Sequence, residues 1–575
     1  MAYVPIMNQP AAALLILGIA ASETASSPCQ AQVVTSRRGL VVTASAPASD
    51  IGAAILKAGG NAVDAAIATA FALAVTYPTA GNIGGGGFMV IRLADGRTTA
   101  IDYRERAPLK STEGMYLDGS GRIDRSRTSE GYLAPGVPGT VRGMALAHQR
   151  YGKLPWRRLV APAADLAAAG FVLTPSLAEE LNWLVKVTTG KYPATVRAYG
   201  KANGTAWVAG EVLKLPDLAR TLARIASDGP DAFYQGPIAD QIAADMAAHG
   251  GIIGKDDLAA YQAVERAPVR GTFLGHEIIA MPPPSSGGIA IVEILNILER
   301  LAIDKRPRFA TSTMHLMIEA QRRAFLDRAE FLGDPDYVTV PVGKLTSKDH
   351  AAELAASIDT TTSSNSVALA TGRLAVEPGD EPEQTTHFSV VDEWGNAVAN
   401  TYTLEQGYGS RVVVAGAGFL LNNEMGDFNQ KPGTTTTGGD IGTKPNLIAP
   451  GKRMLSSMSP TIVTRDGKVV LVTGSPGGRT IINTVHQIVL NAVGFGMDVR
   501  AAVDAPRLHH QWLPDGVWIE SAVPDSTVAR LEQFGHRVHR AGRMGDGHSI
   551  AVDPKTGLAT GANDKRSPDS KASSP

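Results

Sequence analysis

The chain has a single cysteine, Cys29, among its 575 residues. One thiol excludes an internal disulfide framework and a zinc site built from several cysteines. Neither sign of charge is in excess, because 54 Lys and Arg stand against 55 Asp and Glu and the formal net charge is -1. Because phosphate binding requires a positive field, we expect no nucleic-acid partner.

Long apolar runs are also lacking. The apolar run Ala11 to Ala21 is too short for a transmembrane helix and is typical of the hydrophobic region of a secretory signal. Cleavage after Ala21 or after Ala31 would place small residues suitably, and we assign residues 1–31 to the signal. The sequence therefore predicts a periplasmic or secreted protein.

What is present is an ordinary globular composition, with 44% apolar and 19% charged residues. Pro47 to Asp50 predict the cap of a helix over 51–58, and Asn61 predicts the start of a second helix to about Val75. The alternating residues 88–92 predict a strand. Helical and strand patterns therefore mix along the chain.

An acidic segment, Glu377 to Glu383, lacks apolar periodicity and predicts an exposed linker. Residues 384–392 are then rich in β-formers, residues 393–396 predict a turn, and residues 397–404 predict a second strand. This order predicts a β-hairpin. A strand directly after a loose acidic linker is a natural place for a precursor to be cut.

Cleavage between Gln384 and Thr385 would leave a hydroxyl and a free α-amine on one residue. An α-amine titrates near pH 8, so it can accept the hydroxyl proton without a separate histidine. Thr403 would lie nearly opposite Thr385 in the hairpin, where its hydroxyl could hold the new amine. The pattern predicts an N-terminal threonine nucleophile.

A glycine-rich turn supplies candidate donors for an oxyanion. Gly474 to Gly478 follow the strand-like residues 469–473 and precede a helical run near Thr480. Free amides at a helix start favour negative charge, so Gly477 and Gly478 are the predicted oxyanion donors.

Nine segments along the chain together form a recognisable set. The five in its second half that carry the chemistry are Gln384–Val390 (QTTHFSV), Asn400–Leu404 (NTYTL), Leu421–Phe428 (LNNEMGDF), Leu455–Pro460 (LSSMSP) and Gly474–Gly478 (GSPGG). The remaining four are Gly84–Met89 (GGGGFM), Asp102–Pro108 (DYRERAP), Pro282–Gly288 (PPPSSGG) and Ala505–Trp512 (APRLHHQW). Taken in their order along the chain, these segments resemble the signature motifs of γ-glutamyltransferases (glutathione hydrolases).

The resemblance runs from about residue 40 to about residue 564 and implies the N-terminal-nucleophile hydrolase fold. This is an α+β, four-layer αββα sandwich in which two stacked sheets lie between helical layers. The family builds it jointly from two subunits of one precursor, here residues 32–384 and 385–575. By the same resemblance, Thr385 is the nucleophile and first residue of the small subunit.

The resemblance also assigns the other site residues. Thr403 supports the nucleophile, and Gly477 and Gly478 form the oxyanion pair. The residues matched to the substrate's glutamyl end are Arg104, Ser456 and Ser457 for its α-carboxylate, and Asp427 with Glu424 for its α-ammonium. Arginine suits a carboxylate because its planar fork binds two oxygens at once.

Two departures from the family pattern affect specificity. Glu405 stands where the family often has Asn; it could bind the ammonium but repel the carboxylate. The segment 431–453, which corresponds to a lid, contains no aromatic residue. A pocket without an aromatic gate is wetter, which favours hydrolysis over transfer.

The implied substrates are glutathione and other γ-glutamyl compounds, with water or amino acids and dipeptides as acceptors. We expect no cofactor and no metal; adjacent His509 and His510 point opposite ways in a strand and are interpreted as structural. Two alternatives stay open: a cephalosporin or glutaryl acylase with the same machinery, and an unprocessed paralogue that only binds amino acids. Arg104 and Asp427 argue against the first, and an intact Thr385 against the second.

Overall fold

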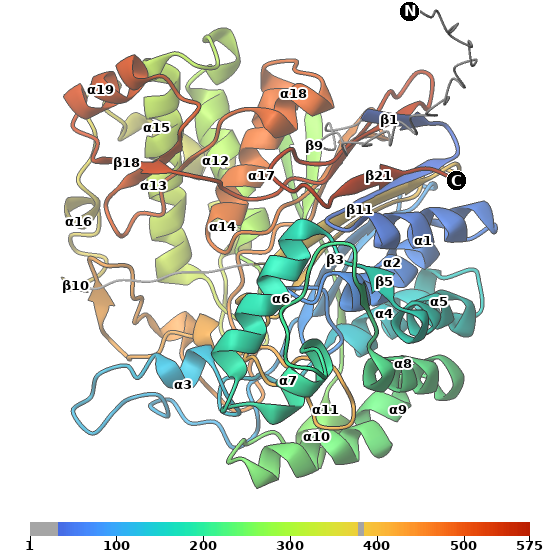
Figure 1. Cartoon of the computed structure of the whole chain (residues 1–575). Helices are drawn as coiled ribbons and strands as arrows, with labels where there is room; N and C mark the ends of the chain where they lie inside the picture. Colours follow the sequence, from blue (N-terminus) through green and yellow to red (C-terminus); the bar gives the residue numbers. More distant parts are fainter. Residues whose placement is uncertain (1–32, 378–384) are drawn as a thin grey trace, which may run out of the picture. The chain divides into compact units, whose positions relative to one another are not determined.

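Two seven-stranded antiparallel sheets lie in contact at the centre of the computed structural model, which describes residues 33–377 and 385–575 (Figure 1). Sheet I has the order β1 (Val33–Ser36), β20 (Ala559–Ala562), β19 (Ser549–Val552), β15 (Lys468–Thr473), β14 (Thr461–Arg465), β9 (His276–Ala280) and β8 (Val269–Phe273). Sheet II has the order β21 (Lys571–Ser573), β2 (Gly39–Thr43), β11 (Thr386–Asp392), β12 (Ala397–Thr403), β3 (Gly86–Arg92), β4 (Thr98–Tyr103) and β7 (Val264–Arg266).

The two faces of sheet II are buried in different cores, because successive side chains of a strand point to opposite faces. In β3, Met89 and Ile91 pack into a core with helices, whereas Phe88 and Val90 pack into the core shared with sheet I. Sheet II is therefore an inner layer with no face open to water.

A first helical layer covers the outer face of sheet II, where α2 contacts β11 and β12. The helices of this layer are α1 (Ala46–Lys57), α2 (Ala62–Thr76), α4 (Thr140–Tyr151), α5 (Trp156–Ala169), α6 (Pro175–Thr188), α7 (Pro193–Tyr199), α8 (Pro216–Asp228), α9 (Asp231–Tyr234), α10 (Pro237–Ala248) and α11 (Lys255–Ala260). In Figure 1, α1, α2 and α5 lie at the right.

A second helical layer covers sheet I, where α12 contacts β8 and β9 and α17 contacts β15. Its helices are α12 (Gly287–Arg300), α13 (Thr311–Phe331), α14 (Val342–Leu345), α15 (Lys348–Ala356), α17 (Thr480–Val489), α18 (Val499–Asp504) and α19 (Asp525–Gln533). The predicted four-layer αββα sandwich is thus confirmed.

Shorter elements connect these layers. They are α3 (Ser126–Ser129), α16 (Ser366–Leu369), η1 (Ile303–Lys305), η2 (Glu424–Asp427), η3 (Lys444–Asn446), η4 (Leu490–Gly494), and the small strands β5 (Phe171–Val172), β6 (Val212–Leu213), β10 (Val376–Glu377), β13 (Thr435–Thr436), β16 (Leu508–His509), β17 (Val517–Glu520) and β18 (Val538–Ala541). The parallel pair β10–β13 joins the end of the segment before residue 378 to the predicted lid.

The local predictions hold with one exception. Asn61 caps α2, because its side chain accepts from the Asp64 amide and the Asp64 side chain accepts from the Asn61 amide. The predicted cap of the first helix at 47–50 is wrong: α1 starts at Ala46, since Pro47 fits the first turn, where no amide partner is needed.

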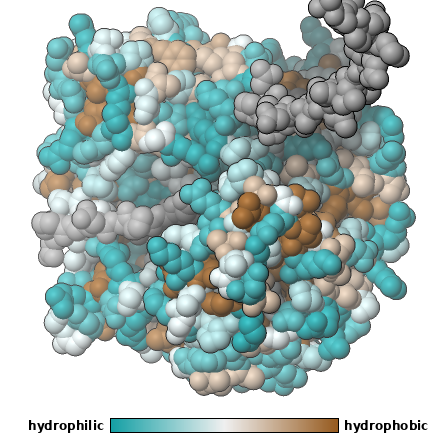
Figure 2. Space-filling model, in the orientation of Figure 1, coloured by the Kyte–Doolittle hydropathy of each residue, from teal (hydrophilic) through white to brown (hydrophobic). Residues whose placement is uncertain are grey.

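The outer surface is mainly polar on the face seen in Figure 2, with apolar residues in separate patches. Within residues 33–377 and 385–575, no helix combines the length and apolar character that crossing a bilayer requires. The predicted signal, residues 1–31, and most of the acidic linker lie outside the described residues.

Candidate active site

One small pocket gathers side chains from both halves of the chain. It has a volume of about 20 Å³ and is lined by Arg104, Thr385, Thr403, Glu405, Glu424, Asp427, Ser456, Ser457, Met458, Gly478 and Ile481. All predicted site residues except Gln384 and Gly477 therefore line one space; Gln384 lies outside the described residues, and Gly477 is the neighbour of Gly478.

The hairpin β11–β12 positions the two threonines. Its register pairs Thr386 with Tyr402, so one step further Thr385 lies opposite Thr403, as the sequence predicts. The Thr403 hydroxyl oxygen accepts from the Glu405 amide at 2.8 Å. At Gly85, an added Cβ would lie 2.1 Å from the carbonyl oxygen of Thr403, so only glycine lets this loop approach the strand.

The turn between β15 and α17 exposes two consecutive amides. Gly477 and Gly478 have φ angles of 121° and 53°, in the region that favours glycine. Their carbonyls accept from the amides of Thr480 and Ile481 at 3.0 and 3.1 Å, which closes the turn. Within the described residues, neither glycine amide donates to a main-chain carbonyl, so both are available to an oxyanion.

Arg104 is fully buried and engaged by acidic residues on one side. Its Nη1 lies 2.6 Å from Glu424 Oε2 and 3.6 Å from Glu105 Oε2, and its Nη2 bonds Asp427 Oδ2. Nε also donates to the carbonyl of Met454 at 3.3 Å. The residues assigned to the carboxylate and to the ammonium are thus bonded to each other, because η2 carries Glu424 and Asp427 onto the guanidinium.

Burial shifts the pKa of two carboxyls beside Arg104. It raises the pKa of Glu105 to about 8, although Arg104 opposes the shift. It raises the pKa of Glu424 well above its usual range, again against Arg104. Burial therefore disfavours the charged form of both carboxyls, and Arg104 favours it.

The two serines assigned to the substrate carboxylate lie on an extended segment before β14. Ser457 Oγ accepts from Arg328 Nη2 of α13 at 3.1 Å, and Ser456 Oγ accepts from the Met458 amide at 3.1 Å. Ser456 also pairs with Ser285 in an isolated parallel β-bridge, which puts the Pro282–Gly288 motif directly behind the pocket. Arg328 and Glu105 are not among the residues predicted from the sequence: Glu105 lies within the motif Asp102–Pro108, but no spacing along the chain signals Arg328.

The histidines have structural surroundings. His387 is buried, with Nδ1 2.8 Å from Thr401 Oγ1 and Nε2 3.1 Å from Ser389 Oγ. Burial lowers its pKa well below the usual value, so the ring is neutral and is occupied by strand neighbours. His509 Nδ1 likewise lies 2.6 Å from Asn483 Nδ2.

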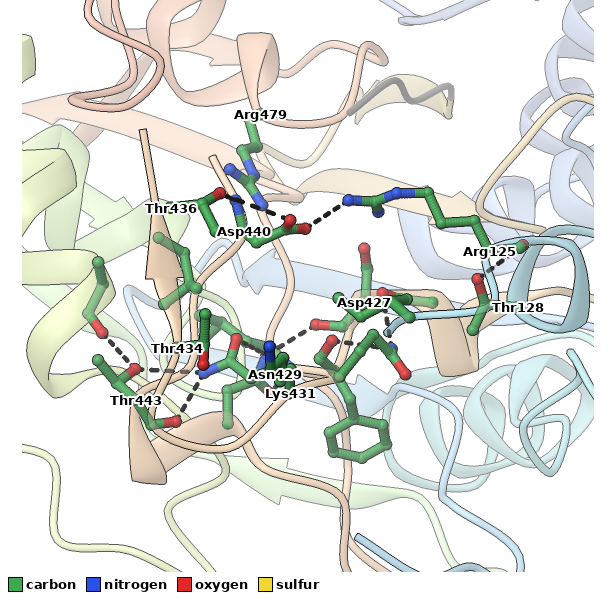
Figure 3. A pocket seen from close by; sticks show the side chains of 18 of the residues that line it. Arg125, Thr128, Asp427, Asn429, Lys431, Thr434, Thr436, Asp440, Thr443 and Arg479 are labelled. Carbon is green, nitrogen blue, oxygen red and sulfur yellow. Dashed lines mark hydrogen bonds and ion pairs between the residues drawn. The ribbon is translucent and has the colours of Figure 1, made fainter. Parts of the chain in front are cut away.

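A second, larger cavity of about 300 Å³ adjoins the first, and Asp427 lines both (Figure 3). The lid segment borders it, and two arginines from outside this segment bind it. Arg125 Nη2 bonds Asp440 Oδ1 at 2.6 Å across the cavity (Figure 3). Arg479 Nη1 donates to the Gly439 carbonyl at 3.1 Å. An ion pair and a hydrogen bond from an arginine side chain to a main-chain carbonyl thus help to hold the lid, which lacks an aromatic residue.

Comparison with known proteins places this site in a family. The sequence model described as Gamma-glutamyltranspeptidase matches residues 48–574. The glutathione hydrolase proenzyme of Escherichia coli (strain K12) is 47% identical over 536 residues, which are 93% of this chain and 92% of that protein.

Two solved structures share the fold. Cephalosporin acylase from Bacillus halodurans superimposes with a TM-score of 0.82 at 28% identity, over 96% of this chain and 98% of that chain. The gamma-glutamyltranspeptidase of Helicobacter pylori gives a TM-score of 0.55 at 43% identity, over 56% of this chain and 91% of that chain. The fold is the N-terminal-nucleophile hydrolase sandwich, and the chain belongs to the gamma-glutamyltranspeptidase family.

Proposed function

We propose that the chain is a self-processing γ-glutamyltransferase and glutathione hydrolase that forms a γ-glutamyl ester on Thr385. The observation that carries this proposal is the pocket that unites Thr385 and Thr403 with Gly478, Arg104 and Asp427. Family membership and the 47% identical glutathione hydrolase proenzyme support the same activity.

In the reaction, the α-amine of Thr385 takes the proton of its own hydroxyl as the oxygen attacks the γ-carbonyl carbon. The amides of Gly477 and Gly478 stabilise the oxyanion of the tetrahedral intermediate. The C–N bond then breaks, the amine leaves with the proton, and the glutamyl group stays as an ester. Water or an amino group attacks this ester and regenerates the hydroxyl.

The charged residues beside Thr385 read the zwitterionic end of the glutamyl group. Arg104 with the hydroxyls of Ser456 and Ser457 takes the α-carboxylate, and Asp427 takes the α-ammonium. Because Arg104 and Asp427 are bonded to each other in the structure, the substrate replaces part of an existing ion pair. This exchange keeps each buried charge compensated while the substrate binds.

We propose cleavage between Gln384 and Thr385, which divides the chain into residues 32–384 and 385–575. Both sheets contain strands from before and after this point, and β11 and β12 lie between β2 and β3. The two pieces therefore share hydrogen bonds and cores and stay together as a large–small heterodimer after cleavage. The pocket of about 20 Å³ holds about one water, so it must widen when a glutamyl group binds.

The larger cavity beside Asp427 is the proposed place of the leaving group and of the acceptor. Its polar lining and the absence of an aromatic residue in 431–453 favour water at the ester. We therefore propose that hydrolysis exceeds transfer to amino acids or dipeptides. Comparing both rates at saturating acceptor tests this point.

The test compares wild type with Thr385→Ala by denaturing gels, intact mass and release of p-nitroaniline from its γ-glutamyl amide. Wild type is expected to split before Thr385 and to release product, whereas the variant stays whole and inactive. Thr386→Ala is the matched control, because this buried neighbour has a hydroxyl with no hydrogen-bond partner among the described residues. A wild type that never splits would contradict the proposal.

A wild type that splits but ignores γ-glutamyl amides would instead favour the acylase alternative. Less supports that alternative, since the acylase structure is 28% identical and the glutathione hydrolase proenzyme 47%. Export to the periplasm or the outside is a separate proposal that depends on residues 1–31, and N-terminal sequencing of the mature protein tests it.

A further inference from the structure

Within the part of the chain that the structure describes, two groups of His and carboxylate side chains lie outside the active site, each with three ligand-type atoms within 4.8 Å of one another. The first, His315, Glu319 and His536, is satisfied by the protein. Glu319 Oε1 accepts from Arg322 Nε at 3.2 Å, and Oε2 accepts from Arg323 Nη1 at 2.7 Å. His315 Nδ1 lies 2.7 Å from His536 Nε2. Two arginines already neutralise this carboxylate, so the group needs no ion.

The second group joins three helices that are distant in the sequence: Glu293 of α12, Asp327 of α13 and His350 of α15. Glu293 and Asp327 are each 1% exposed. Asp327 Oδ2 lies 2.6 Å from His350 Nε2. By contrast, Glu293 Oε1 has no hydrogen-bond partner among the described residues, although it is buried.

The charges around this second group are unevenly matched. Arg373 bonds the other oxygen of Asp327, and its Nε also donates to Glu330 Oε2 at 2.5 Å. No ion pair to Glu293 occurs within residues 33–377 and 385–575 at salt-bridge distance, and Arg373 and Lys344 act on it only through space. A buried carboxyl in this position needs either a proton or a cation.

We propose that Glu293, Asp327 and His350 form a binding site for a divalent metal ion of the Zn²⁺ type. Two carboxylate oxygens and one imidazole nitrogen are ligands that Zn²⁺ accepts, and a water completes a four-coordinate site. Binding displaces the proton held between Glu293 and Asp327, and the imidazole proton moves to Nδ1 of His350. Metal affinity therefore falls as the pH is lowered.

The site has a structural role behind the active site and does not depend on the proposed function. Asp327 is followed by Arg328, whose Nε donates to Ser286 Oγ at 2.9 Å and whose Nη2 donates to Ser457 Oγ at 3.1 Å. A metal ion at Asp327 fixes the end of α13 against α12 and α15. It thereby holds the helix that supports the serines of the pocket.

The experiment uses the untagged full-length protein, stripped with EDTA, dialysed and titrated with ZnCl₂. Metal content after gel filtration and the melting temperature are measured together. Glu293→Gln keeps the shape and a hydrogen bond to Asp327 but cannot lose a proton to the metal. Asp349→Asn on the same helix as His350 is the control, because its side chain is exposed and makes no printed ion pair within the described residues. His350→Gln is a second variant that removes the nitrogen ligand.

Wild type and the control are expected to retain one equivalent of Zn²⁺ and to melt at a higher temperature when loaded. Glu293→Gln and His350→Gln should each bind Zn²⁺ at least about tenfold more weakly. Zinc binding that is equal in wild type and Glu293→Gln would overturn the proposal, since the ion would then lie elsewhere. A wild type that binds no Zn²⁺ would overturn it too and leave a shared proton between Glu293 and Asp327.

Discussion

Gly477→Ala is a direct test of the turn that carries the proposed oxyanion donors. Gly477 has a φ of 121°, which alanine rarely adopts. The added Cβ would lie 2.5 Å from Thr480 Oγ1, and this hydroxyl donates to the Gly477 carbonyl at 2.6 Å. The substitution therefore strains the backbone and breaks the hydrogen bond that shapes the turn.

The two costs can be separated with a matched glycine. Backbone strain of this type costs about 1–3 kcal/mol, and the lost hydrogen bond adds about 0.5–1.5 kcal/mol. Gly96→Ala carries only the first cost, because Gly96 has a φ of 92° and no atom within 4 Å of the added Cβ. The difference in unfolding free energy between the variants thus reports the contact with Thr480.

Gly477→Ala and Gly96→Ala should differ much more in activity than in stability. Displacing one oxyanion donor lowers kcat by about 10²–10³, whereas Gly96→Ala should keep the wild-type kcat per processed molecule. The assay is p-nitroaniline release from the γ-glutamyl amide, divided by the cleaved fraction seen on a denaturing gel. If Gly477→Ala is as active per cleaved molecule as Gly96→Ala, these amides do not bind the oxyanion and the reasoning fails.

Four further substitutions test three other parts of the structure. Glu105→Gln should become more stable relative to wild type as the pH rises from 4.5 to about 8, because folded wild type keeps a proton on Glu105 that its unfolded state loses. The difference in unfolding free energy, measured by thermal melts, should grow by at most about 1.4 kcal/mol per pH unit. A difference that does not depend on pH would contradict this reasoning. Arg125→Gln should leave the melting temperature nearly unchanged, since the partly exposed ion pair of Arg125 with Asp440 contributes about 1 kcal/mol or less. It should raise the ratio of hydrolysis to transfer by up to about fivefold. Asp440→Asn removes the same pair and should have the same effect. Phe388→Ala should lower the unfolding free energy by about 3–5 kcal/mol, because this fully buried ring packs on Tyr402; an unchanged melting curve would exclude that packing.

Local sequence determined much of this protein. The pairing of Asn61 with Asp64 depends on residues three apart, so it is visible in the sequence and present at the start of α2. The hairpin and the opposition of Thr385 and Thr403 depend on a short turn that fixes the register of its strands. The glycine turn before α17 is equally local. Motif order added the family and its fold.

Only the tertiary structure decided which charges meet. Arg104 and Glu424 are far apart in the chain, yet the fold buries them 2.6 Å from each other, and burial then raises the pKa of Glu424. Glu293, Asp327 and His350 come from three helices, so no spacing along the chain signals their cluster. Secondary-structure propensity and turn geometry act over a few residues, whereas burial and charge pairing depend on how distant segments pack. The sequence alone therefore predicts the hairpin but not the electrostatics of the pocket.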